Sequence, residues 1–249
     1  MDFSAQHTWE NYDPRGKVLL RLNKIRALIP PDVRSILDVG CGNGIITNAL
    51  AENYAVTGLD PSSTALSYVL GPSVQASISS IPCGNRSFDL ASCNEVLEHL
   101  STSDFEQGIS ELKRVASSYL LIGVPHREQL AKKFFRCADC GHSEHAHGHL
   151  RSFTLGYLDA LFAPDYERLN VSVFGIRERD IPAWLLRCKR RQGQWFVPPP
   201  GSTCPVCGSA GFMHQSTPAT KLCNALNLII SRPRPYWLLA LYRRKSGLE

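Results

Sequence analysis

Three glycines alternate in one short segment of the chain, an arrangement that suits close contact between the main chain and a small ligand. They are Gly40, Gly42 and Gly44, within the run ILDVGCGNG at residues 36–44. Glycine lets the backbone adopt positive φ and approach a ligand, and the N–H groups of a following helix can receive polar atoms. A dinucleotide-binding loop would need its third glycine at position 45, which is Ile45. The spacing therefore argues against a dinucleotide site.

Two pairs of cysteines have the spacing of metal ligands. Cys137 and Cys140 form one C-x-x-C-G knuckle, and Cys204 and Cys207 form another. Four thiolates make a closed tetrahedral zinc site, which is structural because no coordination position stays open. The stretch between the pairs is longer than in a compact zinc ribbon. We predict a four-cysteine structural zinc site, and the alternative for these thiols is redox chemistry.

Histidines near the first cysteine pair could act in proton transfer. An unperturbed imidazole titrates near neutrality, which suits a general base. His126 follows an apolar segment, and His149 precedes the helix expected after Thr154. Both are candidate catalytic bases. The alternatives are loop-stabilising hydrogen bonds, replacement of one zinc-binding cysteine by His142 or His145, and metal ligation by the wider histidine cluster of this segment, residues 142–149.

The elements that must position these residues alternate between strands and helices. Hydrophobic periodicity predicts helices over residues 17–29, 45–52, 62–70, 105–117 and 154–162. It predicts strands over residues 35–39, 54–59, 74–78, 88–93, 119–124, 169–176 and 236–242. This alternation predicts an α/β fold, with a Rossmann-like seven-stranded, mostly parallel sheet and helices on both faces. The polar or Pro/Gly-rich stretches that interrupt it are interpreted as small Cys-rich insertions.

Four motifs in order along residues 36–100 resemble those of a known family. The run at residues 36–44 resembles motif I of class I S-adenosylmethionine (SAM)-dependent methyltransferases, in the form typical of the ubiquinone/menaquinone-biosynthesis-like group. Asp60 ends the second strand, Ile81-Pro82 is followed by Ser87-Phe88-Asp89, and residues 94–100 read NEVLEHL. Each resembles the family's motif at the corresponding place.

The resemblance implies how SAM is held. Gly40, Cys41 and Gly42 would lie against the amino-acid moiety of SAM, and Asp38 would help to place its amino group. Asp60 would accept hydrogen bonds from both ribose hydroxyls, as an acid does in dinucleotide folds.

The resemblance also covers the other side of the donor pocket. Asn94 and Glu95 would edge the pocket beside the methionine part. The family often has an acid that contacts the adenine amine, and here that position is Ser77. Adenine contact is therefore assigned to Ser77 and Ile78. In this fold the last strand is antiparallel and returns beside the sixth, so both insertions leave the ligand-binding edge and one zinc ion could pin them over the acceptor side.

These expectations divide the chain into five parts. Residues 1–126 are the SAM-binding half of the methyltransferase domain, and residues 127–152 are a Cys/His-rich insertion. Residues 153–176 complete the core. A second insertion with the C-x-x-C pair covers residues 177–235, and residues 236–249 form the final strand and a basic tail.

Composition limits the class and location of the protein. The chain has 249 residues, of which 43% are hydrophobic and 20% charged, as in ordinary globular proteins. No apolar run reaches the roughly 20 residues that span a bilayer, and residues 1–10 lack the features of a secretory signal. We therefore expect a cytoplasmic protein without a transmembrane segment. Residues 1–126 contain 9 Lys/Arg and 13 Asp/Glu, whereas residues 127–249 contain 18 and 9. The basic half could face an anionic acceptor or simply be solvated.

The predicted function is SAM-dependent methyl transfer to oxygen. The H-x-R-S-F run at residues 149–153 resembles, more loosely, methyltransferases of bacterial glycan and natural-product pathways. It implies a small-molecule, sugar or lipid-linked glycan acceptor. One alternative is an RNA methyltransferase. The fourth strand argues against it, because it ends in NEVL and not in the N/D-P-P-Y-type motif used for exocyclic amines of bases. Another is a SAM-binding interaction protein without catalysis.

A stripe of apolar residues near the C-terminus adds a candidate partner. Leu222, Ala225, Leu226 and Ile229 have helical spacing and are followed by arginines. Such a basic amphipathic segment can contact an anionic membrane peripherally. We expect instead that the stripe packs on its own domain.

Overall fold

The computed structural model describes residues 16–246. The N-terminal segment on which the signal-peptide argument rests, and the last three residues of the basic tail, lie outside this range. The described chain divides into two compact units. The core unit comprises residues 16–126, 153–175 and 237–246, and the insert unit comprises residues 127–152 and 176–236. Within residues 16–246, every helix is too short or too polar to cross a lipid bilayer.

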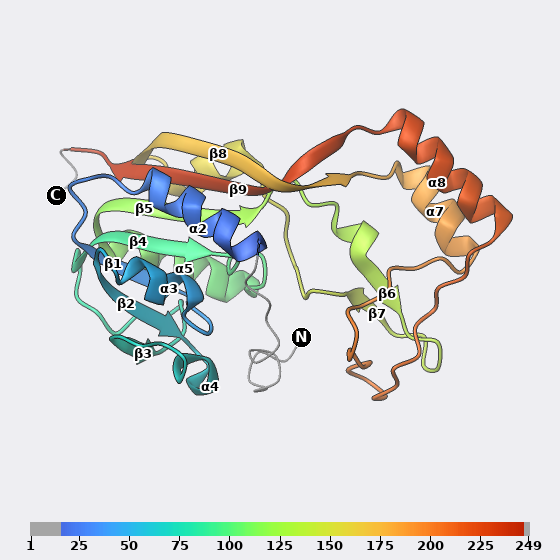
Figure 1. Cartoon of the computed structure of the whole chain (residues 1–249), viewed down its shortest axis with the longest axis horizontal. Coiled ribbons are helices and arrows are strands. Elements are labelled where there is room, and N and C mark those ends of the chain that lie inside the picture. Colours follow the sequence, from blue (N-terminus) through green and yellow to red (C-terminus); the bar gives the residue numbers. More distant parts are fainter. Residues whose placement is uncertain (1–15, 247–249) are drawn as a thin grey trace. The chain divides into compact units, whose positions relative to one another are not determined.

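A seven-stranded sheet organises the core unit, and Figure 1 shows its strands. Its order is β3-β2-β1-β4-β5-β9-β8. The strands are β1 (Ser35–Val39), β2 (Ala55–Asp60), β3 (Ser73–Gln75), β4 (Phe88–Asn94), β5 (Ala116–Pro125), β8 (Tyr166–Arg179) and β9 (Pro233–Arg244). Strands β1 to β5 pair in parallel, and β9 is antiparallel to β5. The prediction of a Rossmann-like, mostly parallel sheet with an antiparallel last strand is confirmed.

The central strands are buried along most of their length. Four of the five residues of β1 are buried, the exception being Ser35, and β5 is buried continuously from Tyr119 to Pro125. Such runs are typical of parallel sheets, because helices cover both faces. Leu37, Leu59 and Leu120 belong to one large apolar core cluster of the sheet, and each is fully buried.

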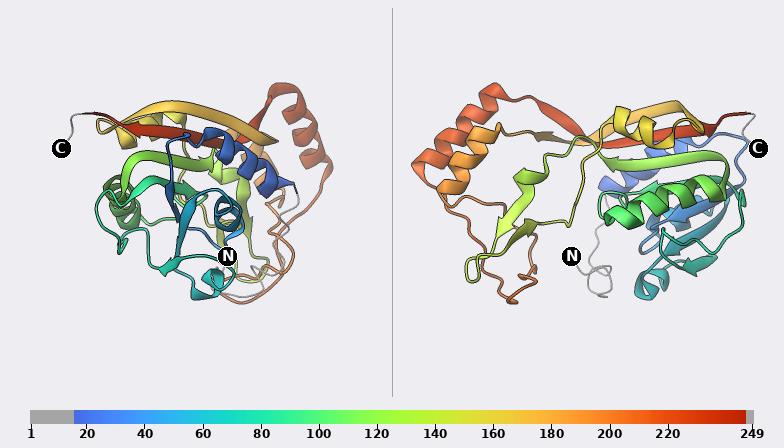
Figure 2. Two further views of the ribbon diagram at one scale, coloured as in Figure 1. Left: turned by 60° about the vertical axis from the view of Figure 1, so that its left-hand side comes forward. Right: turned by 180° about the vertical axis from the view of Figure 1, so that it is seen from behind.

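Helices cover the two faces of this sheet. The helices α2 (Lys17–Leu28) and α3 (Ile45–Leu50) contact each other, as do α5 (Thr102–Val115) and α6 (Leu155–Phe162). Figure 2 shows α5, in green, on the face opposite α2 and α3, in blue. Ser101 begins α5, because its Oγ accepts the main-chain N–H of Asp104 at 3.1 Å. Helices on both faces are thereby confirmed.

The helix predicted over residues 62–70 is shorter in the structure. It is α4 (Ser63–Leu66), capped by Ser62, whose Oγ accepts the N–H of Ala65 at 3.2 Å. The chain then leaves the helix because the Asn48 side chain replaces the helical bonds. Its Nδ2 donates to the carbonyl of Tyr68 at 3.0 Å, and its Oδ1 accepts the N–H of Leu70 at 2.9 Å.

The insert unit has its own small elements. They are the 3-10 helix η1 (Leu130–Lys133), the antiparallel pair β6 (Phe134–Arg136) and β7 (Ser143–His145), α7 (Ala183–Arg191) and α8 (Pro218–Ile230). The helices α7 and α8 pack on each other through Leu185, Leu186 and Cys223. Periodicity did not reveal α7, because four of its nine residues are charged and its buried leucines, Leu185 and Leu186, are adjacent in sequence.

Most of the apolar stripe of α8 does not pack on its own unit as expected. Leu226 is half-buried and packs on the small core between α7 and α8, whereas Leu222, Ala225 and Ile229 are exposed. The buried residues of the helix are Thr220, Cys223 and Asn227. Polar bonds fix this orientation. Thr217 and Thr220 form a capping box at the start of the helix, and Asn227 Oδ1 accepts the hydroxyl of Ser231 at 2.6 Å at its end. The inward face is therefore the one whose polar groups find partners.

Candidate functional site

The glycine loop joins β1 to α3 and holds the backbone in the left-handed region. Gly40, Gly42 and Gly44 have φ of 73°, 54° and 72°. A Cβ on Gly40 would lie 2.2 Å from Cγ2 of Val96, so only glycine fits there. The N–H groups of Gly40 and Cys41 both donate to the carbonyl of Leu59, at 2.7 and 3.0 Å. These bonds fix the loop to the end of β2.

Asp38 is a buried acid at the base of this loop. Its Oδ2 accepts the hydroxyl of Thr47, on α3, at 2.7 Å. Burial raises the pKa of Asp38 to about 6, although the bond from Thr47 and the charge of Arg21 act in the opposite direction. A cationic group placed beside this carboxylate would stabilise its ionised form. The position thus suits an ammonium ligand.

Asp60 ends β2 and stabilises the loop from the other side. Its Oδ2 accepts the N–H of Gly42 at 2.9 Å, and its Oδ1 accepts the N–H of Ser62 at 2.9 Å. Each carboxylate oxygen has two lone pairs, so it can accept a second donor from a ligand hydroxyl. Asp60 therefore orients the loop whether or not a ligand is bound.

Three other residues that were predicted to bind SAM have different surroundings. Cys41 packs on Gly58, where an added Cβ would lie 2.9 Å from its Sγ, and burial raises the pKa of its thiol. Ser77 is exposed, and its Oγ lies 2.8 Å from that of Ser79. The side chain of Ile78 is buried in the core. Any ligand contact by Ile78 must therefore come from its main chain.

The end of β4 presents one amide and one carboxylate. Asn94 is buried and donates from Nδ2 to the hydroxyl of Ser92 at 2.7 Å, while its buried Oδ1 has no hydrogen-bond partner among residues 16–246. Glu95 has a positive φ of 58°. Its Oε2 accepts from Trp237 Nε1 at 3.0 Å and lies 3.7 Å from Arg21. Asn94 thus offers an acceptor, whereas Glu95 is anchored.

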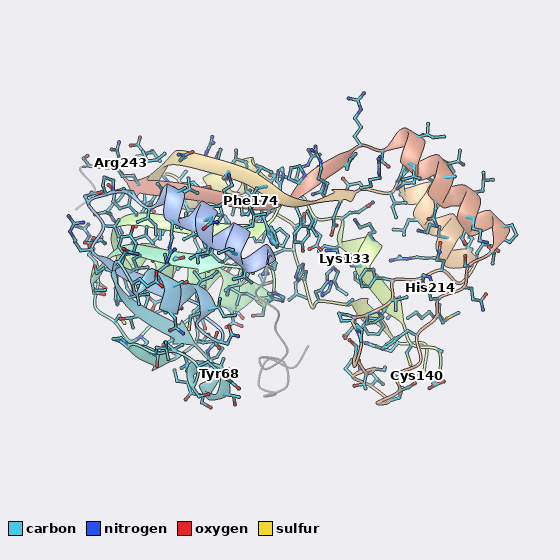
Figure 3. All side chains as sticks on the ribbon, viewed as in Figure 1. Tyr68, Lys133, Cys140, Phe174, His214 and Arg243 are labelled. Carbon is cyan, nitrogen blue, oxygen red and sulfur yellow. The ribbon has the colours of Figure 1, made fainter. Side chains whose placement is uncertain are left out.

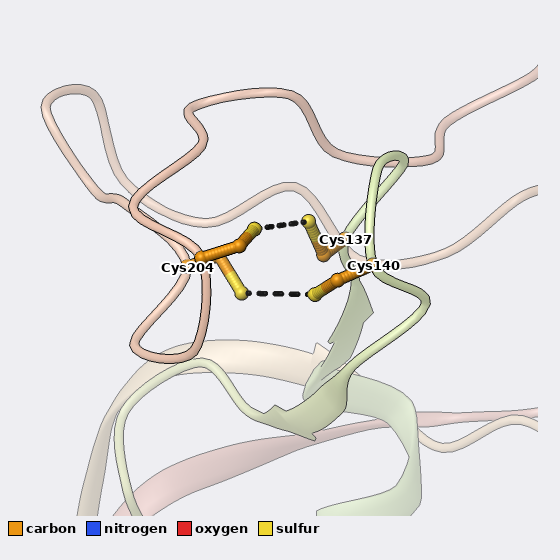
Figure 4. Close-up of side chains that lie close together, drawn as sticks. Cys137, Cys140 and Cys204 are labelled. Carbon is orange, nitrogen blue, oxygen red and sulfur yellow. Dashed lines mark hydrogen bonds between the residues drawn. The ribbon is translucent and has the colours of Figure 1, made fainter.

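The four cysteines of the two knuckles come together in the insert unit (Figure 4). All four Sγ atoms lie within 4.8 Å of one another. Cys137 lies 3.6 Å from Cys207, and Cys140 lies 3.6 Å from Cys204. These separations are too long for disulfides, which need about 2.05 Å, and close to the ~3.8 Å edge of a tetrahedron with Zn–S bonds of about 2.3 Å.

Main-chain bonds shape both knuckles. The N–H of Cys137 donates to the carbonyl of His142, and that of Cys204 donates to Ser209, each at 2.8 Å. The glycines that follow the pairs, Gly141 and Gly208, have positive φ of 73°. The N–H of Cys140 is the main cause that lowers the pKa of Cys137 to about 6. A lowered thiol pKa favours the thiolate that metals bind.

A second polar cluster in the insert unit is centred on Glu128. Its carboxylate is buried and lies 2.7 Å from Lys133 Nζ; Lys133 is labelled in Figure 3. His149 Nδ1 contacts Glu128 Oε2. Burial by itself would raise the pKa of Glu128, but the hydrogen bonds and charges of His149 and Lys133 outweigh it and lower the pKa to about 2. Glu128 is therefore ionised at neutral pH.

The protonation of the two nearest histidines follows from their partners. His145 Nδ1 accepts the N–H groups of His147 and His149, at 3.3 and 3.1 Å, so its proton lies on Nε2. This tautomer cannot coordinate a metal through Nε2, although Glu128, His145 and His149 have the proximity of a metal site. Because Glu128 is ionised, His149 Nδ1 must donate to it, and Nε2 is then the nitrogen that accepts a proton in the neutral imidazole.

Two neighbours complete this cluster. Lys133 Nζ lies 3.3 Å from Tyr236 Oη and 3.3 Å from Glu178. Burial lowers the pKa of His145 and of His147 to about 4, which keeps both neutral at pH 7. A Lys ammonium beside the carboxylate opposes a bound cation. The cluster has the chemistry of an oriented base rather than of a metal centre.

The other candidate base, His126, belongs to the core unit. It follows β5 directly and forms a parallel bridge with Phe153. The structure brings the four cysteines together and, separately, His149 with Glu128. His126 belongs to the core unit and His149 to the insert unit.

Comparison with known proteins identifies the region that carries the glycine loop. Residues 37–119 match the family model described as a methyltransferase domain. A ubiquinone biosynthesis O-methyltransferase of Paracidovorax citrulli is 32% identical over 111 residues, which cover 38% of this chain and 47% of that protein. The enzyme of the same name from Albidiferax ferrireducens is 36% identical over 111 residues, covering 38% and 44%. The chain spans about half the length of these curated relatives.

Solved structures share the fold over most of the chain. A SAM-dependent methyltransferase from Archaeoglobus fulgidus superposes with a TM-score of 0.54 at 14% identity, covering 92% of this chain and 96% of that one. One from Mesorhizobium loti gives 0.53 at 19% identity, covering 89% and 96%. The chain thus shares the fold of these methyltransferases, and residues 37–119 match the methyltransferase domain model. The resemblance predicted for residues 36–100 is confirmed.

The methyltransferase domain includes every residue predicted to bind SAM. These residues are Asp38, Gly40, Cys41, Gly42, Asp60, Ser77, Ile78, Asn94 and Glu95. The two histidines and four cysteines lie beyond the matched range. Their roles rest on geometry alone.

Sequence reasoning missed three members of the Glu128 cluster. Glu128 and Lys133 are ordinary polar residues in a stretch that lacks periodicity, and Tyr236 was assigned only to the last predicted strand. The proximity of Glu128 to the end of the fifth strand was the one available signal. Its pairing with His149 depends on the path of the insertion.

Proposed function

We propose that this chain is a SAM-dependent methyltransferase that acts on a hydroxyl group. The observation that supports the proposal beyond methyl transfer is the buried Glu128–His149 pair, in which His149 Nδ1 faces an ionised carboxylate, as in the pairs that orient a general base. Curated relatives named O-methyltransferases support the same chemistry. The acceptor is a small molecule, a sugar or a lipid-linked glycan.

The donor site suits SAM. Bound SAM supplies an electrophilic methyl group on a sulfonium. Asp38 receives the ammonium of its amino-acid part, since this carboxylate is buried with a raised pKa, and the Oδ1 of Asn94 is a further acceptor. The backbone of Gly40 allows close approach, and Asp60 receives the ribose hydroxyls.

The remaining proposed contacts edge this pocket. Ser77 and the main chain of Ile78 lie against the adenine. Cys41 and Gly42 line the amino-acid moiety with their backbone, and Glu95 borders the methionine part from its position at the end of β4.

His149 removes the proton of the acceptor hydroxyl. The acceptor oxygen forms a bond to the methyl carbon as the carbon–sulfur bond breaks, and the proton passes to His149 Nε2. Glu128 stabilises the resulting imidazolium through Nδ1–H, so it acts as a positioning residue. His126, which follows β5, is the second candidate base.

We further propose that Cys137, Cys140, Cys204 and Cys207 hold one structural Zn²⁺. Their spacing fits a tetrahedral thiolate site. The ion would join the two insertions, residues 127–152 and 177–235, within a methyltransferase core made of residues 1–126, 153–176 and 236–249. A cytoplasmic location, where such thiols stay reduced, belongs to this proposal.

The first test is transfer of labelled methyl from SAM into cell extract. The extract is separated into nucleic acid, lipid/glycan and small-molecule pools. Label in either of the last two supports the proposal and identifies the acceptor to purify. Label in RNA overturns it in favour of an RNA methyltransferase, and SAM binding with no labelled product favours a non-catalytic role.

With the acceptor in hand, His149→Asn tests the base. We expect kcat to fall by roughly 10²-fold or more while the SAM dissociation constant stays unchanged. His147→Asn is the matched control, because His147 is in the same loop and has no hydrogen bond to Glu128. Near-normal turnover of the His149 variant would transfer the role to His126.

A further inference from the structure

The helix α8 has an apolar face that the insert unit does not use. Leu222, Leu228 and Ile229 are exposed by 61%, 62% and 80%. Ala225, between them in the helical repeat, is exposed as well. We call these four residues the outer face of α8. Single exposed hydrophobic residues are ordinary, but a continuous helical stripe marks an interaction surface.

The inward side of α8 explains why this face stays outside. Cys223 is buried and Leu226 packs against α7, whose Leu185 and Leu186 form the other half of this small core. Both sides of the helix are apolar, yet only one can contact α7. Figure 2 shows the two helices side by side, in orange and red.

Charge selects the partner. Every charged residue of α7 and α8 is basic: Arg187, Lys189, Arg190, Arg191 and Lys221. Lys221 lies beside Leu222 at the start of the outer face, and the exposed Arg232 follows the end of the helix. The apolar stripe is thus bracketed by cations, which is the pattern of a helix that lies in an anionic lipid surface.

We propose that the outer face of α8, with Lys221 beside its first residue and Arg232 just beyond its end, docks on an anionic lipid bilayer. The aliphatic side chains enter the boundary between headgroups and acyl chains, and the arginines and lysines bind lipid phosphates. This inference rests on the insert unit alone and is independent of the proposed methyl transfer. It adds a membrane surface as the place where the protein works.

Two other partners fit these residues less well. A second copy of the chain would place the basic residues of α7 and α8 against identical basic residues across a two-fold axis. Single-stranded RNA is bound by aromatic side chains that stack on bases, whereas leucine and isoleucine dominate the outer face. A bilayer of anionic lipid satisfies both the apolar stripe and the cations.

Flotation of the full chain with lipid vesicles tests the proposal. We expect binding to phosphatidylcholine vesicles that contain 30% phosphatidylglycerol, and at least tenfold weaker binding to phosphatidylcholine alone. Binding should weaken as salt is raised, because surface charges are screened. The double variant Leu222→Ser/Ile229→Ser should reduce binding about tenfold or more, and Lys221→Glu/Arg232→Glu, at the two ends of the same face, should do the same.

The matched control is Leu70→Ser. Leu70 is exposed by 88% on the core unit, after α4, so its loss should leave vesicle binding unchanged. Circular dichroism and zinc content establish that each variant is folded. Three outcomes overturn the proposal: no binding to anionic vesicles, equal loss in the Leu70 variant, or a dimer or RNA complex that the Leu222/Ile229 variant abolishes while the intact chain ignores vesicles.

Discussion

Asp38 shows how one buried acid can report on the donor site. Burial raises its pKa to about 6, because it outweighs the hydrogen bonds of Thr47 and Ser92 and the charge of Arg21. The proposed SAM ammonium would lower the pKa again. Binding of SAM and release of a proton are therefore linked.

The first prediction is that SAM affinity depends on pH through Asp38. Below pH 6 the free protein holds a proton on Asp38 that must leave when the ammonium binds, so affinity should fall as pH falls. From pH 7 to pH 5 we expect about a tenfold increase in the dissociation constant, measured by calorimetry. Asp38→Asn should weaken binding and remove the pH dependence, whereas Asp104→Asn, on the first turn of α5, should change neither. A pH-independent wild type would contradict the proposed contact.

The second prediction concerns Glu128. Glu128→Gln should lower kcat on the order of 10²-fold, because an amide no longer enforces the tautomer that leaves His149 Nε2 as acceptor. The SAM dissociation constant should stay the same. Glu178→Gln is the control, since Glu178 also contacts Lys133, at 3.3 Å, but not His149. An equal loss of kcat in the two variants would mean that Glu128 acts by holding Lys133 and not by orienting His149.

Sequence reasoning succeeded for residues whose neighbours are close in the chain. The glycine loop and Asp60 follow or end neighbouring strands, and a parallel sheet places such strand ends together. Their order along the chain is therefore enough to predict that they lie close to each other. The pairing of Glu128 with His149 could not be predicted, because it depends on how η1, β6 and β7 fold back. Ile78 was predicted to meet adenine, but its side chain is in the core.

At the scale of elements, the turn between β1 and α3 is the most constrained. Our third prediction is that Gly40→Ala destabilises the fold by about 2 kcal/mol or more, since alanine at φ 73° is strained and its Cβ would lie 2.2 Å from Val96. Urea unfolding measures the loss, and SAM binding should weaken as well. Gly84→Ala is the control, because the space around Gly84 is open. Equal stability of the two variants would show that the loop can relax.

The elements themselves divide into those that pattern predicts and those that contacts decide. Strands β1, β4 and β5 are long apolar runs, and their pattern is clear without a structure. The length of α4 depends on Asn48, which belongs to α3. The orientation of α8 depends on Thr217, Thr220 and Asn227. Hydrophobic spacing favoured the wrong face of α8, because both faces of that helix carry apolar residues.

At the scale of the whole molecule, donor binding and the proposed base belong to different units. All nine residues assigned to SAM lie in the core unit, whereas His149, Glu128 and the four cysteines lie in the insert unit. Loss of the metal should therefore affect SAM binding and the proposed proton transfer differently.

The fourth prediction is that zinc removal abolishes turnover and spares SAM binding. Purified protein should contain about one zinc per chain, and a strong chelator or Cys204→Ser should remove it and disorder the knuckles. SAM affinity should change less than twofold by calorimetry, because the glycine loop keeps its bonds to β2. The control is Cys93→Ser, which changes a buried cysteine outside the cluster. This variant should keep about one zinc per chain. Zinc content well below one in the wild type would refute the metal site.

The place of β9 in the sheet has a consequence for how the protein is made. It lies between β5 and β8, yet residues 126–232 separate it from β5 in sequence. On the ribosome, the outer edge of β5 stays open until β9 emerges, and open edges promote aggregation. Both cysteine pairs emerge earlier. Zinc captured by the nascent chain would shorten the loop that β9 has to close, so metal supply during synthesis should govern the yield of soluble protein.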